Sequence, residues 1–394
     1  MNILFVGHIL NPNDLSKFPA ASIAGNNMQL GYIESLYKYL EHDIEVISQL
    51  PISIYPKSKH IHIKMHTLDI GNSHRAISPS FINLPFLKSC TLKQSTSTLI
   101  QSWLNKHKDN EKVIISFNTL PQIALPVIRY SKKHDVKTIC IFADPPIDPF
   151  KRSIIGRIYK NYEFLQSMKL IKRFDGVIAL NQKIVEDYAP MVPYEIIEGG
   201  INLDLFNQEI TPKQNGVKRI VYSGALTEYS GCKKLIESLA YIQEKNFVIE
   251  FYGSGPLVKY IKSFSKNDAR VQYLGIQSNQ NMINVERNAD FLINPRKIHD
   301  PISTYTFPSK ILEYLATGTP TLSTKVNGLT PYYLNHLNIV ETDDPISFAQ
   351  SLEWILNSDY AILKEKALYA KKEILNEKNW MEQTKKLLAF INAL

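Results

Sequence analysis

Short apolar runs alternate with helix-length segments along the whole chain. This pattern predicts buried strands that are each followed by a helix, as in parallel sheets with both faces covered. A polar stretch at 207–216 separates two such series, so we expect two Rossmann-like, doubly wound α/β domains. The expected strands of the first are 2–7, 43–50, 112–117, 137–143, 176–180 and 194–200, and those of the second are 219–224, 247–253, 271–275, 289–295 and 319–324.

The length of 394 residues agrees with two domains, because single hydrophobic cores rarely extend beyond about 250–300 residues. We place the N-terminal domain at 1–200 and the C-terminal domain at 201–380. Periodicity alone leaves open whether the last helix, 381–394, returns to the first domain. Ligands of such sheets bind beyond the carboxyl ends of the strands, so we expect the two sheets to face a shared cleft.

Composition narrows the class of protein. The three cysteines (Cys90, Cys140 and Cys232) are widely spaced and odd in number, which fits neither a disulfide framework nor a metal site. No apolar run approaches the roughly 20 residues that span a bilayer, and the apolar N-terminus is read as a strand and not as a signal peptide. These features favour the cytoplasm. The net charge of +8 suggests an anionic partner, and the absence of recognised motifs argues against nucleic acid.

The segment 304–320 predicts one short helix with a prepared amino end. Pro308 suits the first helical position and Gly318 the exit, so we expect a helix over 308–317. Its opening turn holds Ser309 and Lys310 but no carboxylate, which favours a bound anion at the helix dipole. Glu313 follows one turn deeper, where it suits the ribose of a nucleotide. The alternative is that Ser309 is a simple cap and Glu313 a surface residue.

Several other strand ends carry residues that suit phosphate binding. Gly25 precedes a helix after the first strand, and Gly224 and Gly253 end strands of the second domain. Glycine allows backbone amides to approach a phosphate closely. Arg296 follows another strand end and offers a positive charge. Each turn alone is a weak signal, but four of them on the same side of the two sheets are much less likely to be accidental, and they predict phosphate binding there.

The motifs of the second half resemble those of nucleotide-sugar glycosyltransferases of the two-domain GT-B type, in particular the retaining family 4. The resemblance is carried by YSGALTEYSGCKKLIESL (222–239), FYGSGPL (251–257), ADFLINPR (289–296) and FPSKILEYLATGTPTL (307–322). LINPR with FPSK also resembles a branch common among bacterial capsule and exopolysaccharide transferases. The N-terminal half matches only in pattern. The resemblance implies a nucleoside-diphosphate sugar donor, with UDP as the expected nucleotide.

Two departures from the family pattern affect the site. The family has two glutamates separated by seven residues that face the donor sugar and the ribose; Glu313 matches the second, but Tyr305 stands in place of the first. The usual arginine and lysine after the first strand of the second domain are replaced by Ala225 and Ser230. We therefore expect Arg296 and Lys310 to hold the diphosphate, the alternative being that both are surface charges.

In the first domain, Asp144 follows a strand where many family members have a histidine near the donor sugar. We expect Asp144 to contact the sugar or the acceptor, unless it only caps the chain before two prolines. Asn118, at the preceding strand end, is a second candidate, and His8 after the first strand is read as structural. The catalytic candidates are thus Asp144, Asn118 and Tyr305.

The resemblance implies a retaining transfer of a hexose from a UDP-sugar to an acceptor hydroxyl, with no metal and no cofactor. A glycan, a lipid-linked sugar and a protein are all open as the acceptor. Two alternatives remain. The loss of the sugar-facing glutamate at Tyr305 fits a catalytically silent partner or chaperone of another transferase, and a sugar-nucleotide epimerase has a similar architecture.

The segment 151–174 predicts contact with an anionic membrane surface at the inner face of the cell membrane. It contains seven basic residues and one acidic residue, Glu163. Basic residues near an anionic surface attract it by about 1 kcal/mol each. The alternative for the apolar stripe is that it packs on the sheet while the charges face water. The basic residues are Lys151, Arg152, Arg157, Lys160, Lys169, Lys172 and Arg173, and the stripe is Ile154, Ile158, Tyr162, Leu165, Met168 and Ile171.

Overall fold

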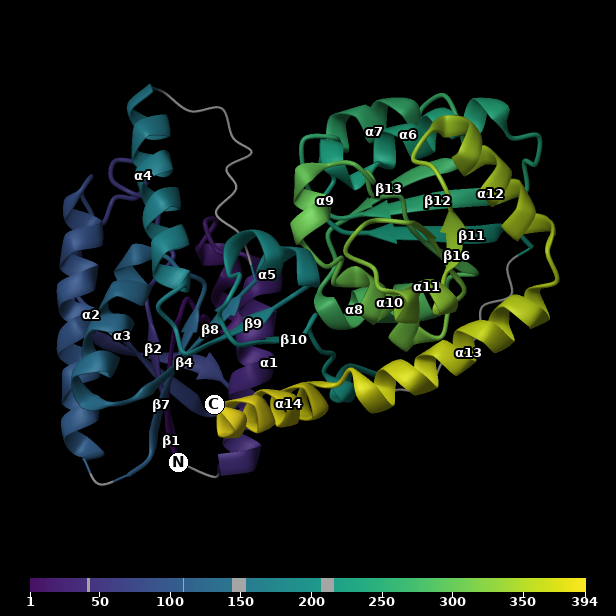
Figure 1. The fold of residues 1–394 in the computed structure, drawn as a ribbon. Coiled ribbons are helices and arrows are strands. Elements are labelled where there is room, and N and C mark those ends of the chain that lie inside the picture. Colours follow the sequence, from purple (N-terminus) through teal and green to yellow (C-terminus); the bar gives the residue numbers. More distant parts are fainter. Residues whose placement is uncertain (41–42, 109, 144–153, 207–215) are drawn as a thin grey trace. The chain divides into compact units, whose positions relative to one another are not determined.

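The chain forms two compact α/β units (Figure 1). The computed structural model describes residues 1–394 except 41–42, 109, 144–153 and 207–215. Unit 1 comprises Met1–Glu198 together with Trp380–Leu394, and unit 2 comprises Gly199–Asn379. Each unit is built around a largely or wholly parallel sheet, which confirms the predicted class of two Rossmann-like α/β domains.

In the part of unit 1 that the structure describes, the main sheet has eight strands in the order β10-β9-β8-β7-β1-β2-β5-β4. All neighbours are parallel except β4 and β5, which form an antiparallel hairpin at one edge. The strands are β1 (Asn2–Gly7), β2 (Ile44–Ser48), β4 (His66–Gly71), β5 (His74–Ser78), β7 (Lys112–Phe117), β8 (Lys137–Phe142), β9 (Gly176–Ala179) and β10 (Tyr194–Ile196), and a small separate sheet pairs β3 (His62–Ile63) with β6 (Phe81–Ile82).

The edge hairpin was missed by the sequence pattern. In β4 only Ile70 is buried, and the other side chains are half-buried or exposed. An edge strand with one covered face needs few apolar residues, so it lacks the continuous apolar run that marks the central strands β1 and β7. The strands expected from continuous apolar runs are present.

Helices cover both faces of the unit 1 sheet (Figure 1). On one side α3 packs between α2 and α4, and on the other α14 packs against α1. The helices are α1 (Ile23–Leu40), α2 (Leu87–Lys106), α3 (Pro121–His134), α4 (Ile154–Ile171), α5 (Gln182–Tyr188) and α14 (Trp380–Ala393), with a short 3₁₀ helix η1 (Pro12–Lys17) after β1.

The C-terminal helix α14 is seated on α1 through one aromatic contact. The Trp380 ring lies beside Tyr32, with ring centroids 5.0 Å apart. The same indole covers Gly31, where a Cβ would lie 2.1 Å from the ring. The Tyr39 hydroxyl donates a hydrogen bond to the Met381 carbonyl oxygen (3.2 Å). The absence of a side chain at Gly31 therefore allows the last helix to pack directly on the first.

Among the described residues of unit 2, six parallel strands form one sheet in the order β13-β12-β11-β14-β15-β16. Counted within the unit, this is the order 3-2-1-4-5-6 of nucleotide-binding Rossmann sheets, and it reverses between β11 and β14. The short strand β16 was not predicted. The strands are β11 (Lys218–Ser223), β12 (Phe247–Tyr252), β13 (Val271–Gly275), β14 (Phe291–Asn294), β15 (Thr321–Thr324) and β16 (Asn338–Val340).

Two helical layers enclose the unit 2 sheet (Figure 1). The larger apolar cluster lies under α6, α7 and α12, and a smaller one lies under α8 and α10 on the opposite face. The helices are α6 (Cys232–Glu237), α7 (Val258–Phe264), α8 (Asn279–Arg287), α9 (Pro301–Tyr305), α10 (Lys310–Thr317), α11 (Pro331–His336), α12 (Pro345–Asn357) and α13 (Tyr360–Glu377), with 3₁₀ turns η2 (Leu203–Phe206), η3 (Glu228–Ser230) and η4 (Ser238–Tyr241).

Gly31→Ala is expected to lower the midpoint of thermal unfolding. The added methyl overlaps Trp380, and overpacking of this kind costs about 1–3 kcal/mol, more than the roughly 1 kcal/mol that alanine gains in a helix. Gly216→Ala is the control, because a Cβ there meets nothing within 4 Å. Calorimetry on Gly31→Ala in a Trp380→Ala background should show no further loss; an equal loss in both backgrounds would contradict the assigned contact.

Candidate functional site

The candidate site lies at the carboxyl ends of β11, β12 and β14, beside the point where the strand order reverses. Gly224 and Gly253 lie where the ends of β11 and β12 meet. Gly253 has a φ of +130°, and a Cβ on it would lie 1.9 Å from the Gly224 carbonyl oxygen. The Gly224 amide donates to the Tyr252 carbonyl (3.0 Å). Any side chain at Gly253 would separate the turns, so the two backbones can touch only at glycine.

The turn after β14 packs against the turn after β11 in the same way. Gly231 has a φ of +75°, and a Cβ there would lie 1.6 Å from the Pro295 carbonyl oxygen. The Lys297 amide donates to the Tyr229 carbonyl (3.1 Å). Arg296 is thereby carried to the turn after β11, where its guanidinium lies 5.5 Å from the centre of the Tyr229 ring. Tyr229 directly precedes Ser230, one of the two positions that lack the expected basic side chain.

Arg296 is a mostly enclosed cation with spare donors. Its Nη2 donates to Thr306 Oγ1 (2.9 Å), while its buried Nε has no hydrogen-bond partner among the described residues. Burial lowers the pKa of the guanidinium, although arginine stays charged at any physiological pH. A buried donor without a partner costs roughly 1–3 kcal/mol. The arrangement therefore suits an anion that accepts from this guanidinium.

Helix α10 begins at Lys310, two residues later than expected, and ends at Gly318 in the left-handed conformation (φ 71°) as expected. The difference arises because the first turn is tight: the Ile311 amide bonds to the Pro308 carbonyl three residues earlier (2.8 Å). Ser309 is exposed and makes no side-chain cap hydrogen bond. Glu313 consequently lies in the first turn, so the expectation of an opening turn without a carboxylate is wrong.

A tyrosine fixes α10 to the end of β11. The Tyr314 hydroxyl accepts from the Ser223 amide (2.9 Å), and Ser223 is the last residue of β11. Tyr314 is fully buried, and Ser223 directly precedes Gly224. The amino-terminal half of α10 is thus held beside the glycine turn, which brings together residues that are about 90 positions apart in the chain.

Lys310 is held by two carboxyl groups. Its Nζ lies 3.2 Å from Glu286 Oε1 and also pairs with Glu313. Burial lowers the pKa of Lys310, but the adjacent Glu313 and Glu286 raise it, and the net shift is upward. Lys310 is therefore a firmly charged ammonium that is already positioned at the start of α10.

Glu286, on α8, is fully buried and was not found from the sequence. Ser223 Oγ donates to its Oε1 (2.5 Å). Burial, and secondly the charge of Glu313, raises the pKa of Glu286 to about 8, so the group is mostly protonated at neutral pH. Its position in the helix is the sequence signal that could have found it, because Met282, Ile283 and Glu286 share the apolar face of α8.

The remaining predicted residues are distributed over both units. Tyr305 ends α9 and is half-buried. Asn118 has a φ of +60°, and its Oδ1 accepts from the Ala143 amide (2.9 Å), so it joins the ends of β7 and β8. The Gly25 amide donates to Ser22 Oγ (3.1 Å), which caps α1 internally. Asp144 lies outside the described residues.

His8 has a structural position, as expected. Its Nδ1 lies 2.6 Å from the Gln49 carbonyl oxygen, so this nitrogen carries the proton. Burial lowers the pKa of the imidazole. In the portion of the chain that the structure describes, no group of three or more His, Cys, Asp or Glu side chains is arranged to hold a metal ion.

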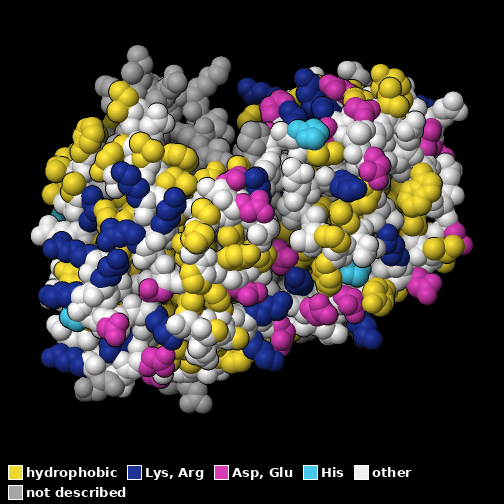
Figure 2. Space-filling model, in the orientation of Figure 1, with side chains coloured by type: hydrophobic (Ala, Val, Ile, Leu, Met, Phe, Trp, Pro, Cys, Tyr) yellow, Lys and Arg dark blue, Asp and Glu magenta, His cyan; other side chains and the backbone are white. Residues whose placement is uncertain are grey.

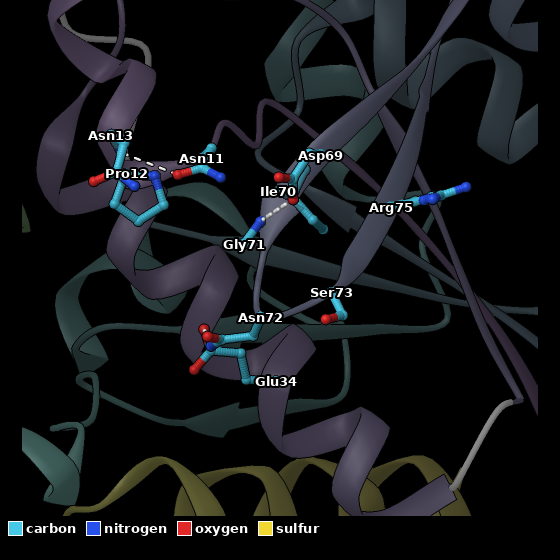
Figure 3. A pocket seen from close by; sticks show the side chains of 10 residues that line it. All are labelled: Asn11, Pro12, Asn13, Glu34, Asp69, Ile70, Gly71, Asn72, Ser73 and Arg75. Carbon is cyan, nitrogen blue, oxygen red and sulfur yellow. Dashed lines mark hydrogen bonds between the residues drawn. The ribbon is translucent and has the colours of Figure 1, made fainter.

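Unit 1 also contains a polar cavity of about 590 Å³ between η1, α1 and the β4–β5 hairpin (Figure 3). Asn72, in the hairpin turn, donates to Glu34 Oε1 of α1 (2.7 Å), and Asp69 Oδ1 accepts from the Gly71 amide (2.8 Å). Carboxylate and carboxamide groups of this kind can bind hydroxyls. The sequence did not indicate the cavity, because its lining comes from separate segments and the hairpin was missed.

These features define a class of protein. Two Rossmann-like units are the construction of the GT-B fold, and the second carries a cationic candidate site at its strand-order reversal. Residues 217–358 match the family described as "Glycosyl transferases group 1". The predicted resemblance to retaining GT-B transferases of family 4 is confirmed.

Solved structures share this fold over the whole chain. A glycosyltransferase from Rickettsia africae is 18% identical (TM-score 0.65), covering 100% of this chain and 98% of its own. The Anabaena protein Alr3699/HepE in complex with UDP is 15% identical (TM-score 0.68), covering 100% of both chains. Sucrose-phosphate synthase from Thermosynechococcus elongatus is 14% identical (TM-score 0.68), covering 100% and 99%. The comparison with curated protein sequences found no match.

Glu286→Gln is expected to flatten the pH dependence of stability. The folded protein holds the Glu286 proton up to a pKa of about 8, whereas the unfolded chain releases it near the ordinary glutamate pKa of 4.5. The free energy of unfolding should therefore fall as pH rises from about 5 to 8, by at most about 1.4 kcal/mol per pH unit from this group.

Urea denaturation across this pH range measures the effect. The exposed Glu365→Gln serves as the control and should retain the slope of the parent protein. Equal slopes for the parent and Glu286→Gln would show that Glu286 is ionised in the folded state.

Proposed function

We propose that this protein is a retaining transferase that moves a hexose from a UDP-sugar to an acceptor hydroxyl without a metal ion. The observation that carries the proposal is the position of Arg296 over Tyr229, at the turn where Ala225 and Ser230 replace the expected basic pair. Arg296, which follows β14, thus places a cation at the turn after β11, where the basic pair is expected. A binding site for the donor diphosphate explains why an arginine with a spare donor is enclosed there.

The donor would lie along the start of α10. Glu313 binds the ribose hydroxyls, and the first amides of the helix face the diphosphate together with Arg296 and Lys310. The helix end adds roughly half a positive charge. As the sugar acquires oxocarbenium character, negative charge accumulates on the leaving diphosphate, and preset cations and amides stabilise it. Stabilisation of the leaving diphosphate then needs no metal ion. The acceptor hydroxyl attacks from the side of the sugar that the diphosphate leaves, so the departing phosphate can take the acceptor proton.

The other assignments rest on less. UDP is proposed because solved structures of this fold are complexes with UDP, with UDP and glucose, and with UDP-2-fluoro glucose. We keep Asp144 as the group that acts on sugar or acceptor, and Tyr305 as the residue facing the donor sugar. Asn118 and Gly25 have internal hydrogen bonds, which weakens their assignment to catalysis and to donor binding.

The acceptor is proposed to be a glycan, a lipid-linked sugar or a protein in bacterial polysaccharide or glycoconjugate assembly. The polar cavity beside the β4–β5 hairpin is a candidate position for its hydroxyls. We place the reaction in the cytoplasm, since Cys90, Cys140 and Cys232 are free thiols. None of the described helices combines the length and the hydropathy that a bilayer-spanning segment needs.

A catalytically silent binding partner is the second candidate, favoured by Tyr305 in place of the sugar-facing glutamate. Mass-spectrometric screening of nucleotide sugars, with and without glycan acceptors, separates the possibilities. A transferase releases UDP faster when the acceptor is present. A silent partner releases none, and an epimerase converts the sugar without any acceptor.

Glu313→Ala is expected to weaken UDP binding at least tenfold while the fold is retained. Loss of a hydrogen bond to a charged group costs about 1.5–3 kcal/mol. Titration calorimetry with UDP measures the effect, and Glu365→Ala on the exposed face of α13 is the control. Unchanged UDP affinity in a folded Glu313→Ala protein would remove Glu313 from the site.

Arg296→Gln and Lys310→Gln are expected to reduce affinity for UDP and for the UDP-sugar far more than for uridine. Only the first two ligands carry the charged diphosphate that these side chains would contact. Lys297→Gln is the control, because it removes the same charge from the next residue in the chain. The Lys297 side chain pairs with Glu228, with Nζ and Oε2 3.7 Å apart. Equal losses for all three ligands would point to a folding defect and would contradict the assignment.

A further inference from the structure

Helix α4 presents an apolar surface to solvent. Ile158, Tyr162 and Leu165 are 66%, 58% and 56% exposed. They are spaced i, i+4 and i+7, so they lie on one face of the helix. The end of the predicted stripe behaves differently, because Ile171 is fully buried and Met168 half-buried. The alternative that the whole stripe packs on the sheet is thus wrong for these three residues.

The same face becomes basic toward the end of the helix. Lys169 follows Ile158 by 11 positions, which returns it to the exposed face, and it is exposed. Lys172, directly after the last helical residue Ile171, is exposed too. Arg173 extends the charge past the helix end. The acidic residue of the helix, Glu163, lies about 140° around the helix axis from Ile158, away from this face.

The neighbouring helix α3 has exposed basic residues of its own at its far end. It packs beside α4, and the Ser167 hydroxyl of α4 donates to the Thr119 carbonyl just before α3 (3.1 Å). Arg129, Lys132 and Lys133 at the end of α3 are exposed. Figure 2 shows Lys and Arg gathered on the visible face of unit 1, with apolar side chains beside them.

We propose that the exposed face of α4 docks on an anionic lipid bilayer, with Ile158, Tyr162 and Leu165 inserted at the boundary of the acyl chains and Lys169 and Lys172 at the headgroups. Exposed apolar side chains with basic residues beside them combine the two attractions that bring a helix to an anionic membrane surface, apolar burial at the acyl boundary and charge at the headgroups. The lysines favour a membrane over a protein partner, because lysine is depleted at protein interfaces. The surface is independent of the donor-site residues, which belong to unit 2.

Flotation of the full chain with lipid vesicles tests the proposal. The protein should float with vesicles of phosphatidylcholine and phosphatidylglycerol but not with phosphatidylcholine alone, and added salt should weaken binding. Lys169→Glu with Lys172→Glu should lower the partition coefficient by about 25-fold or more, since each basic residue contributes about fivefold at an anionic surface. Ile158→Ser, Tyr162→Ser and Leu165→Ser together should abolish flotation.

Matched variants control for general effects on charge and hydropathy. Ile362→Ser, Leu368→Ser and Tyr369→Ser remove three side chains of α13 that are 66%, 50% and 60% exposed. Lys385→Glu with Lys386→Glu reverses two exposed charges of α14. Both control sets should float like the parent protein, and circular dichroism should show all variants folded.

Three outcomes would overturn the proposal: flotation with neutral vesicles as readily as with anionic ones, no flotation with either, and flotation that the α4 variants leave intact. Size-exclusion chromatography addresses a different occupant. A dimer of the parent protein that the triple serine variant of α4 converts to a monomer would assign the face to a second copy of this chain.

Discussion

The site of unit 2 depends on backbones that touch. Gly253 against the Gly224 carbonyl, and Gly231 against the Pro295 carbonyl, bring three turns together at the point where the strand order reverses. A single methyl group at Gly253 or Gly231 would overlap a carbonyl oxygen, and the glycines there have positive φ values that L side chains rarely adopt. The geometry of the candidate site therefore depends first on close backbone packing and only then on its charged side chains.

The two cations of the candidate site, Lys310 and Arg296, are positioned with few negative charges beside them. Lys310 is held between Glu313 and a largely neutral Glu286, so the cation is positioned without two full negative charges beside it. A second ionised carboxylate would oppose an anionic ligand, whereas a protonated one still accepts a hydrogen bond. Arg296 remains the less neutralised of the two cations, since its partners are the Tyr229 ring and a hydroxyl.

Prediction from sequence succeeded where a feature is local. The central strands are continuous apolar runs, and α10 has Pro308 and Gly318 at its ends, so both were found within a few residues. The β4–β5 hairpin was missed because an edge strand needs little burial. Glu286 was missed because a glutamate on the apolar face of α8 acquires meaning only beside Lys310 and Ser223.

The apolar stripe of α4 is another feature that prediction from sequence could not place. Spacing placed Ile158, Tyr162 and Leu165 on one face, but spacing cannot distinguish a buried face from an exposed one, since that depends on which elements pack against it. The sequence by itself determined the central strands of the two sheets, the end of α10 at Gly318 and the resemblance of the second half to the group 1 glycosyltransferases. Tertiary structure alone decided that Arg296 reaches Tyr229, that burial raises the pKa of Glu286 and that Ile158, Tyr162 and Leu165 of α4 are exposed, because each depends on contacts between segments far apart in the chain.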